Sequence, residues 1–331
     1  MKTKAIALIS GGLDSLLAAR VIMDQGIEVS GITFVMTAAS TDAEKAGEQI
    51  QLAAKDAGVE TRVIDISEEF LHIVRSPRHG YGKNANPCID CKIIMLKKAL
   101  DIMKKEKAGF IITGEVLGER PMSQNRRSLD LIRDASGAAG YLLRPLSAKL
   151  LPETEPEKQG TVDREKLLEI SGRSRKPQLE LARRYGLKKY SAPGSSCLLT
   201  DPGFSRKVAD LLEHNALGME EMDLLKIGRH FRFDGRTKAV VGRNEKENSA
   251  LREAKGDKDV ILRLAKGAGP DVLLRGDTGQ DNITKAAGLA VWHSKKRGEN
   301  GVEVSVWKGK RDRQNITAGR IDKEQLEEMR I

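Results

Sequence analysis

The sequence predicts an α/β protein with a doubly wound parallel sheet, followed by a smaller C-terminal α+β domain. Over residues 4–146, apolar runs of strand length alternate with stretches of helical spacing, which is typical of parallel βαβ units. From about Lys226 the pattern changes to short strands and turns. At 331 residues the chain is also longer than one ordinary domain. We therefore expect one domain over residues 1–212 and a second over 226–331.

The elements of the first domain follow in order along the chain. The apolar run KAIALIS ends in two glycines, and helical spacing then continues up to Gly26. A helix is also expected within 43–58, and another from Cys91 to about residue 109. Because ligands bind outside the carboxyl ends of strands in such sheets, the segments 10–15 and 114–124 should converge. Strands are predicted over 4–10, 28–34, 60–66, 109–115 and 141–146.

The remaining segments are less regular. The charged, proline-containing stretch 151–163 is interpreted as a surface loop, and helical segments are expected around 164–186 and 204–215. In the last third, one helix is expected near 283–297. Strands are expected within 231–244, 271–277 and 301–309.

Positive charge is concentrated in two places. Residues 226–331 contain 24 Lys and Arg against 16 Asp and Glu, which accounts for most of the net charge of +10. Both places favour a polyanionic partner, although a solvated face with ordinary Lys and Arg would have the same composition. The second place is formed by Arg173, Arg175, Lys176, Arg183, Arg184, Lys188 and Lys189, opposed only by Glu180.

The hexapeptide SGGLDS lies between a predicted strand and a predicted helix, where backbone N–H groups and the helix dipole bind anions. Gly11 and Gly12 permit a close backbone approach, Ser10 and Ser15 supply hydroxyl donors, and Asp14 is a candidate ligand for Mg²⁺. A purely structural turn is the alternative. No Lys follows the glycines, so this is not the loop of kinases and GTPases.

In this context the loop resembles that of the PP-loop ATP pyrophosphatases, whose SGGxDS segment holds the pyrophosphate of ATP. In that family a substrate oxygen attacks the α-phosphate and AMP is transferred to the substrate. The resemblance implies ATP and Mg²⁺ as cofactors. The loop by itself does not distinguish ligases, amidotransferases and tRNA-modifying enzymes within the family.

The chain has three cysteines, Cys88, Cys91 and Cys197, which help to distinguish between these classes of enzyme. Cys88 and Cys91 stand in NPCIDCK, where the following helix N-terminus is expected to lower the thiol pKa, and Cys197 follows the small-residue segment SAPGSS. An odd number of cysteines without a secretion signal argues against structural disulfides. Three soft ligands suit a [4Fe–4S] cluster with one open iron or a persulfide relay. Structural zinc, with His79 as a fourth ligand, and simple burial are alternatives.

Two segments resemble tRNA thiolases. NPCIDCK is similar to the corresponding segment of the tRNA 2-thiouridylases, and TGEVLGERPMSQN resembles the TGExLGQxxSQ segment that lies beside ATP in the 4-thiouridine synthases. The match departs at Glu119 and Pro121. The residues carried over as ATP contacts are Gly114, Glu115, Ser123 and Gln124. We see no rhodanese-type domain, so sulfur is expected from a separate donor: a cysteine desulfurase, a carrier protein or sulfide.

The C-terminal module resembles the RNA-binding domain of the NFACT proteins through KAVVGRNEKEN, ITKAAGLAVWHSKKR and VEVSVWKG. This resemblance implies that its basic surface follows an RNA backbone. Trp292 and Trp307 are candidates for stacking on bases, with core packing as the alternative reading.

Together these features predict a cytoplasmic, ATP-dependent tRNA sulfurtransferase that adenylates a uridine carbonyl and replaces its oxygen with sulfur. Asp14, Cys88, Cys91 and Cys197 are the candidate catalytic residues, and the three cysteines are also the candidate cluster ligands. Two alternatives are a PP-loop ligase or amidotransferase acting on a small molecule, and a non-catalytic RNA-binding factor. No run of apolar residues reaches the length of a membrane span.

Overall fold

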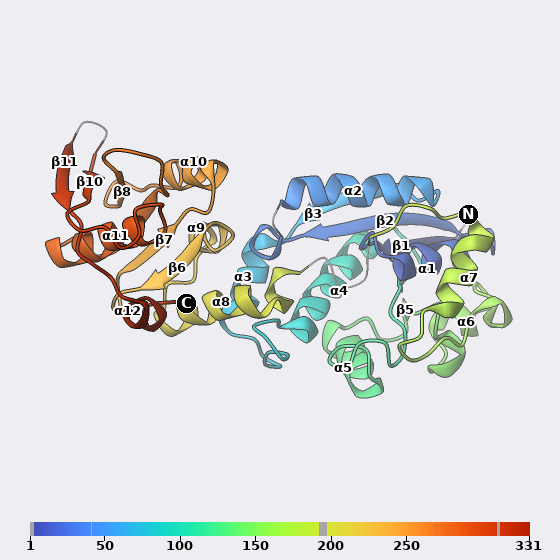
Figure 1. Cartoon of the computed structure of the whole chain (residues 1–331). Coiled ribbons are helices and arrows are strands. Elements are labelled where there is room, and N and C mark those ends of the chain that lie inside the picture. The colour runs from blue at the N-terminus through green and yellow to red at the C-terminus, as the bar shows by residue number, and fades with distance from the viewer. Residues whose placement is uncertain (1–2, 41, 192–196, 310–311) are drawn as a thin grey trace. The chain divides into compact units, whose positions relative to one another are not determined.

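The computed structural model describes residues 3–40, 42–191, 197–309 and 312–331. The chain forms two compact units, Met1–Asp201 and Pro202–Ile331 (Figure 1). Residues 192–196, most of the expected small-residue approach to Cys197, lie outside the described residues.

The first unit is built on a parallel sheet of five strands in the order β3-β2-β1-β4-β5. All four strand pairs are parallel, and β1 lies at the centre with Leu8 paired to Ile32 on one side and to Thr113 on the other. This arrangement confirms the predicted doubly wound α/β class. The strands are β1 (Lys4–Leu8), β2 (Glu28–Val35), β3 (Thr61–Asp65), β4 (Phe110–Thr113) and β5 (Leu142–Leu143).

Helices cover both faces of this sheet, because the strands carry apolar side chains on both sides. Ala5, Ala7 and Phe110 face a core shared with α1, α2 and α7, whereas Ile6 and Ile111 face a core shared with α4 and α5. The six helices of eight or more residues in the described part of this unit are α1 (Leu13–Met23), α2 (Ala43–Asp56), α3 (Ser67–Arg75), α4 (Cys88–Lys105), α5 (Arg126–Ser136) and α7 (Lys176–Tyr185).

The stretch 151–163 is not the plain surface loop that we expected. It contains a short helix, α6 (Glu155–Lys158), which begins with a capping box between Thr154 and Glu157. Pro156 and Glu157 are buried, and Glu157 is paired with Arg164. The local capping interactions and this ion pair outweigh the tendency of a charged, proline-containing stretch to stay solvated. Helices α3 and α5 were also not expected.

The second unit contains a six-stranded antiparallel sheet in the order β11-β10-β8-β9-β7-β6, which confirms the α+β class of the C-terminal domain. Strands β8 and β11 were not among the expected ones. The strands are β6 (Arg229–Arg232), β7 (Lys238–Val241), β8 (Val260–Leu264), β9 (Val272–Arg275), β10 (Glu303–Trp307) and β11 (Arg313–Thr317).

Helices lie on both faces of this second sheet. Val260, Leu262 and Leu264 pack with α11 (Gln280–Trp292), the expected helix, whereas Ile261 packs on the opposite face with Leu224 and Leu251. The expectation of a single helix was wrong, because short polar helices with good N-caps escape a search for apolar spacing. The unexpected helices are α9 (Met219–Leu224), α10 (Glu245–Glu253) and α12 (Lys323–Glu328), whereas α8 (Pro202–Glu213) corresponds to the helical segment expected around 204–215.

Candidate active site

The loop between β1 and α1 has the geometry of an anion-binding turn. Gly12 immediately precedes α1, and the Ser15 hydroxyl donates to the Gly12 carbonyl at 2.8 Å. The Ser10 backbone N–H donates to Ser15 Oγ at 3.2 Å, and the two serine hydroxyls lie 3.3 Å apart. These bonds curve the loop around the first turn of α1, where free N–H groups and the helix dipole attract anions.

Two glycines allow this loop to form. Gly11 has φ +72, and a Cβ at this position would lie 2.8 Å from Ile50 Cγ1. A Cβ on Gly114 would lie 2.4 Å from both the Asp14 carbonyl carbon and the Ser15 nitrogen. The end of β4 therefore touches the loop after β1, which confirms that the segments 10–15 and 114–124 converge.

Buried polar atoms without hydrogen-bond partners gather beside Asp14. They are Asp14 Oδ1, Arg175 Nε and both amide atoms of Gln178, each unpaired among the described residues. Gln178 is completely buried and faces the Asp14 carboxyl, and Asp14 Oδ2 lies 4.0 Å from Arg175 Nη2. Since buried polar groups are nearly always paired in folded proteins, this set indicates a place where a polar ligand supplies the missing partners.

Burial raises the pKa of the Asp14 carboxyl, against the opposing charges of Arg175 and Arg120. Burial also raises the pKa of Glu119, with Asp14 adding to the rise. A cation beside these carboxylates would favour their ionised forms. The unpaired Asp14 oxygen therefore fits the oxygen chemistry of Mg²⁺.

Glu115 is held in an internal network. Its carboxylate accepts from Arg144 Nε at 2.9 Å and from Thr113 Oγ1 at 3.0 Å, and Lys92 Nζ lies 3.8 Å away. Burial works against ionisation, but Arg144, Lys92 and Thr113 outweigh it and lower the pKa of Glu115. Glu115 therefore anchors the end of β4, and its second oxygen, Oε1, has no hydrogen-bond partner.

Ser123 and Gln124, the other two residues carried over for ATP, are both buried. The Gly118 N–H donates to the Gln124 carbonyl at 2.7 Å, which closes the turn between them. Gln124 Oε1 has no partner among the described residues. Their contact with a nucleotide stays a prediction, as it does for the other predicted site residues.

The three cysteines lie in one region of the first unit. Cys88 and Cys91 occupy the first turn of α4, Cys197 precedes a short 3₁₀ turn, and each thiol is within electrostatic reach of another. Asn86 Nδ2 donates to Cys88 Sγ at 3.1 Å and lies 3.7 Å from Met122 Sδ. The CxxC turn is thus tied to the 114–124 segment.

The expectation that a helix N-terminus lowers the thiol pKa was wrong for Cys91. Burial, reinforced by the neighbouring Cys197, raises the pKa of Cys91 to about 12. Burial likewise raises the pKa of Cys197 to about 11. Lys92 favours the thiolate of Cys91 and Arg120 that of Cys197, but neither outweighs the loss of water around the sulfur.

His79, the residue considered as a fourth zinc ligand, is held by Asp90. Its Nδ1 lies 2.8 Å from Asp90 Oδ1, and its backbone N–H donates to Asp90 Oδ2 at 2.9 Å. Asn84 Nδ2, in the same loop, donates to the Thr200 carbonyl at 2.6 Å. These contacts clamp the loop before Cys88 to the CxxC turn and to the segment after Cys197.

Sequence reasoning missed several residues of this site. Arg120 is exposed, and its charge acts on both the Asp14 carboxyl and the Cys197 thiol. Arg175 was counted only as part of a basic patch. Gln178 could have been noticed as a polar residue on the apolar face of its helix, three residues before Leu181 and four before Ala182.

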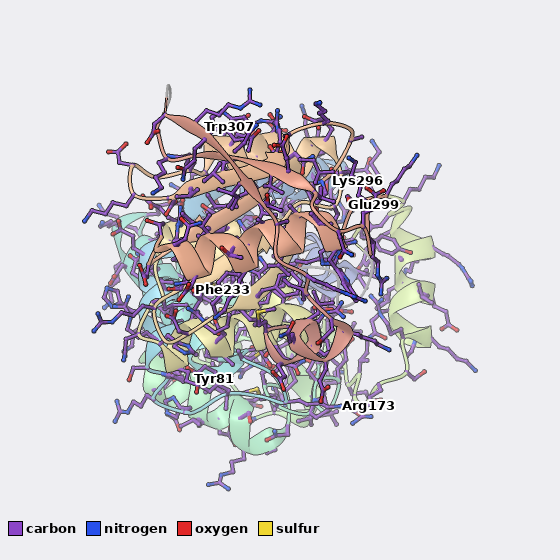
Figure 2. The ribbon with its side chains drawn as sticks, turned by 60° about the vertical axis from the view of Figure 1, so that its left-hand side comes forward. Tyr81, Arg173, Phe233, Lys296, Glu299 and Trp307 are labelled. Carbon is purple, nitrogen blue, oxygen red and sulfur yellow. The ribbon has the colours of Figure 1, made fainter. Side chains whose placement is uncertain are left out.

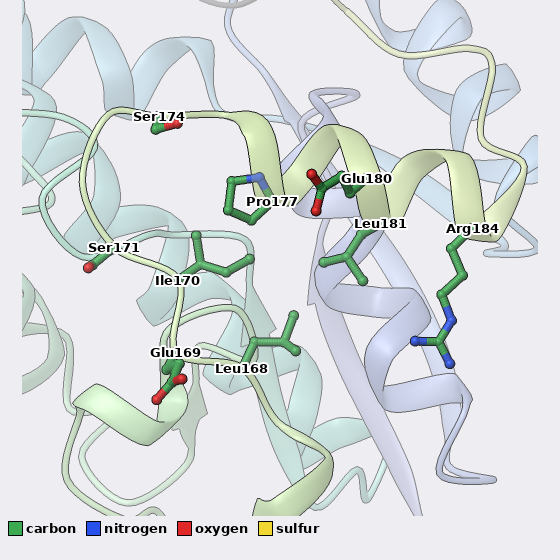
Figure 3. Close-up of a pocket in the computed structure, with 9 residues that line it drawn as sticks. All are labelled: Leu168, Glu169, Ile170, Ser171, Ser174, Pro177, Glu180, Leu181 and Arg184. Carbon is green, nitrogen blue, oxygen red and sulfur yellow. The ribbon is translucent and has the colours of Figure 1, made fainter.

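A separate groove of about 600 Å³ lies beside α7 (Figure 3). Leu168, Ile170, Pro177 and Leu181 form its apolar part, and Glu180 and Arg184 stand near its edge. It contains none of the predicted site residues.

Among the described residues, no group of three or more His, Cys, Asp or Glu side chains is positioned to hold a metal ion. The cysteines therefore have the right chemistry for a cluster without the arrangement of a preformed cage. In the same part of the chain, no helix is both long and apolar enough to cross a membrane.

The first unit is thus an α/β domain of the PP-loop kind, defined by its strand order and by the glycine-rich loop with unpaired polar atoms at the carboxyl edge of the sheet. Residues 1–149 match the family described as thiamine biosynthesis protein (ThiI). Residues 228–330 match the NFACT protein RNA binding domain. The first part of the chain is therefore similar to the ThiI family and the last part to the NFACT RNA binding domain, as the sequence resemblances indicated.

Individual proteins agree with these matches. The chain is 33% identical to the tRNA-specific 2-thiouridylase MnmA of Syntrophomonas wolfei over 30% of each protein. It is 32% identical to a probable tRNA sulfurtransferase of Thermococcus kodakarensis over 43% of this chain and 36% of that protein. A solved 4-thiouridine synthetase in complex with RNA and ATP is 19% identical, with 67% of this chain and 53% of that chain covered and a TM-score of 0.40. These two curated relatives are matched over about a third of their length.

Proposed function

We propose that this protein is an ATP-dependent tRNA sulfurtransferase that adenylates a uridine carbonyl and replaces the oxygen with sulfur. One observation carries the proposal: the charge of Arg120 acts on both Asp14, in the loop with the unpaired polar atoms, and Cys197, which supports a single site that combines the loop and the cysteines. Phosphate binding and sulfur chemistry are the two capacities that this reaction needs at one place. A ligase acting on a small molecule would need only the first.

In this proposal the chain binds ATP with the loop from Ser10 to Ser15. The backbone N–H groups at the start of α1 receive the pyrophosphate part, and Arg175 neutralises the developing charge on the phosphates. Asp14, with its unpaired oxygen, would hold Mg²⁺ against these phosphates. Gln178 supplies an amide donor and an acceptor at the same place.

The first chemical step makes the base carbonyl reactive. The uridine carbonyl oxygen bonds to the α-phosphorus, the bond to the bridging oxygen breaks, and pyrophosphate leaves. The oxygen is now attached to AMP, which is a far better leaving group than oxide. In the second step sulfur attacks the ring carbon, the carbon–oxygen bond breaks, AMP leaves with the oxygen, and a thiocarbonyl remains.

The sulfur reaches the base through the three cysteines. We propose that Cys88, Cys91 and Cys197 hold a [4Fe–4S] cluster, which when bound supplies an iron with an open position for sulfide. A persulfide on one of the thiols is the alternative carrier. After its outer sulfur bonds to the ring carbon, a second cysteine attacks the inner sulfur, and the sulfur–sulfur bond breaks to release the thiocarbonyl. The two cysteines are left as a disulfide that an external thiol reduces. In either case Lys92 and Arg120 favour the ionised sulfur. The donor would be a cysteine desulfurase, a carrier protein or free sulfide.

The C-terminal unit would bind the tRNA. Its match to an RNA-binding domain and its excess of Lys and Arg both support this part of the proposal. Because the reaction consumes ATP and acts on tRNA, we propose the cytoplasm as its location.

The test is nucleoside mass spectrometry of tRNA from a strain that lacks this protein. We expect one thiolated uridine to disappear and to return when the wild-type chain is supplied, but not when Asp14→Ala is supplied. An unchanged set of thiolated nucleosides would overturn the proposal and favour a small-molecule ligase or a non-catalytic RNA-binding factor.

A further inference from the structure

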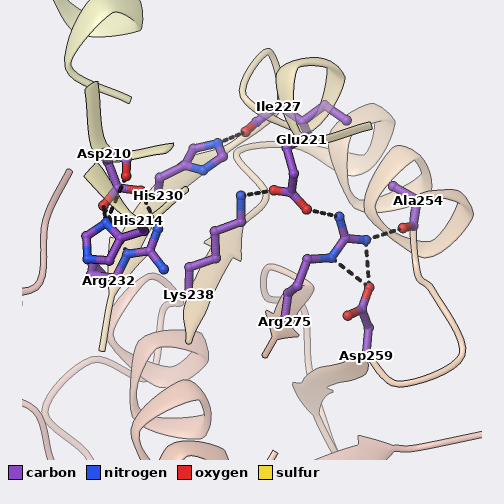
Figure 4. Close-up of polar contacts among 10 residues, drawn as sticks. All are labelled: Asp210, His214, Glu221, Ile227, His230, Arg232, Lys238, Ala254, Asp259 and Arg275. Carbon is purple, nitrogen blue, oxygen red and sulfur yellow. Dashed lines mark hydrogen bonds and ion pairs between the residues drawn. The ribbon is translucent and has the colours of Figure 1, made fainter. Parts of the chain in front are cut away.

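Several cations of the C-terminal unit are neutralised by carboxylates. Lys238 is paired with Glu221, and Arg275 Nη1 lies 2.7 Å from the other oxygen of Glu221 (Figure 4). Arg275 Nη2 also lies 2.6 Å from Asp259 Oδ2. Such cations are committed to holding the fold together and have little capacity left for a polyanion.

A pocket of about 400 Å³ beside the end of α11 is different. Arg297, Arg320 and Lys323 line it, and none of the three pairs with a carboxylate among the described residues. The carboxylate of Asp322, also at this pocket, accepts the Gln325 N–H at 2.8 Å as the N-cap of α12. The lining thus has three cations against two carboxylates, Asp322 and Glu299, and within the described residues none of the three cations is held in an ion pair.

A flat cationic surface lies in the same pocket. The Arg297 guanidinium stands over the half-buried Trp292 ring, 3.8 Å from the centroid. Indole rings and arginine planes are the surfaces on which unpaired nucleobases stack. Glu299, which lies close to Lys296 after α11 (Figure 2), pairs with no cation of the described chain and offers an acceptor for the N–H groups of a base.

The positive region continues from the pocket to strand β6. Arg229, Arg297 and Arg330 all act on His293, and together with burial they lower the pKa of His293 to about 4. The ring is therefore uncharged at neutral pH, and its buried Nε2 has no partner among the described residues. Of the three arginines, Arg330 alone has a carboxylate partner within the described part of the chain, Glu327 at 3.3 Å.

We propose that this pocket binds one unpaired nucleotide of RNA, with the base on the Arg297–Trp292 surface and the flanking phosphates on Arg320 and Lys323. The inference rests on the proposed function, in which tRNA is the partner, and it assigns the contact to a defined pocket. Two cations placed for phosphates and a stacking surface within one pocket are what a single-stranded segment requires.

The first test measures binding of a fluorescein-labelled oligouridine to the full chain over a range of salt concentrations. In the triple variant R297A/R320A/K323A the slope of log affinity against log salt should fall by about 1.4, since the two phosphate contacts at Arg320 and Lys323 contribute about 0.7 each for a single strand. The same slope predicts a loss of affinity of about 25-fold at 0.1 M salt. The control variant R236A/K246A/K258A removes the same charge from exposed, unpaired positions and should keep the slope nearly unchanged.

The second test uses the two tryptophans of the chain as reporters. With Trp307→Phe, saturating oligouridine should change the fluorescence of the remaining Trp292, whereas with Trp292→Phe that of Trp307 should stay constant. The reverse pattern, an unchanged slope in the triple variant, or equal displacement by polyglutamate would overturn the proposal. If the wild-type chain still thiolates tRNA in these cases, only the pocket assignment fails; if it neither binds RNA nor thiolates, the proposed function fails with it.

Discussion

The adjacent glycines of the phosphate loop give the sharpest test of the site, because the structure predicts opposite costs for them. Gly12 has φ −76 and ψ 152, which any residue adopts, and the nearest atom to an added Cβ is Ser10 Oγ at 3.4 Å. Replacing glycine at a permitted conformation gains about 0.4–1 kcal/mol. Alanine is a poorer N-cap than glycine by a similar amount. Gly12→Ala should therefore leave the stability within about 0.5 kcal/mol and Tm within about 2 °C.

Gly11→Ala should behave differently. Its φ of +72 is left-handed, which costs an L residue about 1–2 kcal/mol. The added Cβ would also meet Ile50 at 2.8 Å, and overpacking of this kind costs about 1–3 kcal/mol. The total of about 2–5 kcal/mol corresponds to a fall in Tm of about 5–15 °C for a unit of this size.

The activity should separate from the stability. In the proposed site the phosphates lie beside the Gly12 backbone, so the methyl group of the alanine in Gly12→Ala would displace them. A displacement of about 1 Å costs on the order of 100-fold in rate. The assay is calorimetric unfolding of the full chain combined with RNA-dependent pyrophosphate release. Full activity in Gly12→Ala would refute the assignment of this loop to phosphate, and a Tm as low as that of Gly11→Ala would refute the conformational argument.

Four further predictions concern charge, RNA and sulfur. Asp14→Asn should abolish pyrophosphate release but raise Tm at neutral pH. Because folding raises the pKa of Asp14, the stability that this carboxyl contributes is present below its unfolded pKa and is lost as the pH rises through its folded pKa. The variant should therefore also lose this pH dependence of Tm in calorimetry. Arg144→Met should destabilise the chain by about 3–5 kcal/mol in urea unfolding, since the buried Glu115 carboxylate then keeps only the Thr113 hydroxyl and the more distant Lys92. Adding Glu115→Gln should recover most of this loss. A chain ending at Asp201 should bind tRNA more weakly and with a flatter salt slope than the whole chain, and equal slopes would make the second unit a bystander. Anaerobically purified protein should be brown and contain about four irons per chain. The iron should be lost when any one of Cys88, Cys91 and Cys197 is changed to alanine, and colourless, iron-free protein that still thiolates tRNA would exclude the cluster.

The loop and the sheet could be predicted because their signals are local. Alternation of apolar runs with helical spacing identifies strands and helices over a few residues, and SGGLDS marks the turn between the first two. The prediction failed where a local signal was weak. Helix α5 has a polar, amphipathic sequence that begins with an Asn125 cap, and the charged stretch before α6 is ordered by the buried Glu157.

The thiol pKa values show a local rule overturned by packing. A cysteine in the first turn of a helix is expected to ionise readily, since the helix dipole favours the thiolate. In the folded chain Cys91 is half-buried, and its sulfur lies 3.9 Å from Met36 Sδ, just after the end of β2. Removal of water then dominates, and only the tertiary structure contains that information.

The sequence by itself determined the fold class, the position of the phosphate loop and the residue types available for sulfur chemistry, because each depends on neighbours within a few positions. The tertiary structure decided which distant residues complete the site. Arg175 and Gln178 reach Asp14 only because α7 packs against α1, and Arg120 approaches Cys197 only because two loops meet at the carboxyl edge of the sheet. These contacts join positions that are 70 or more residues apart, and no periodicity along the chain encodes such a pairing.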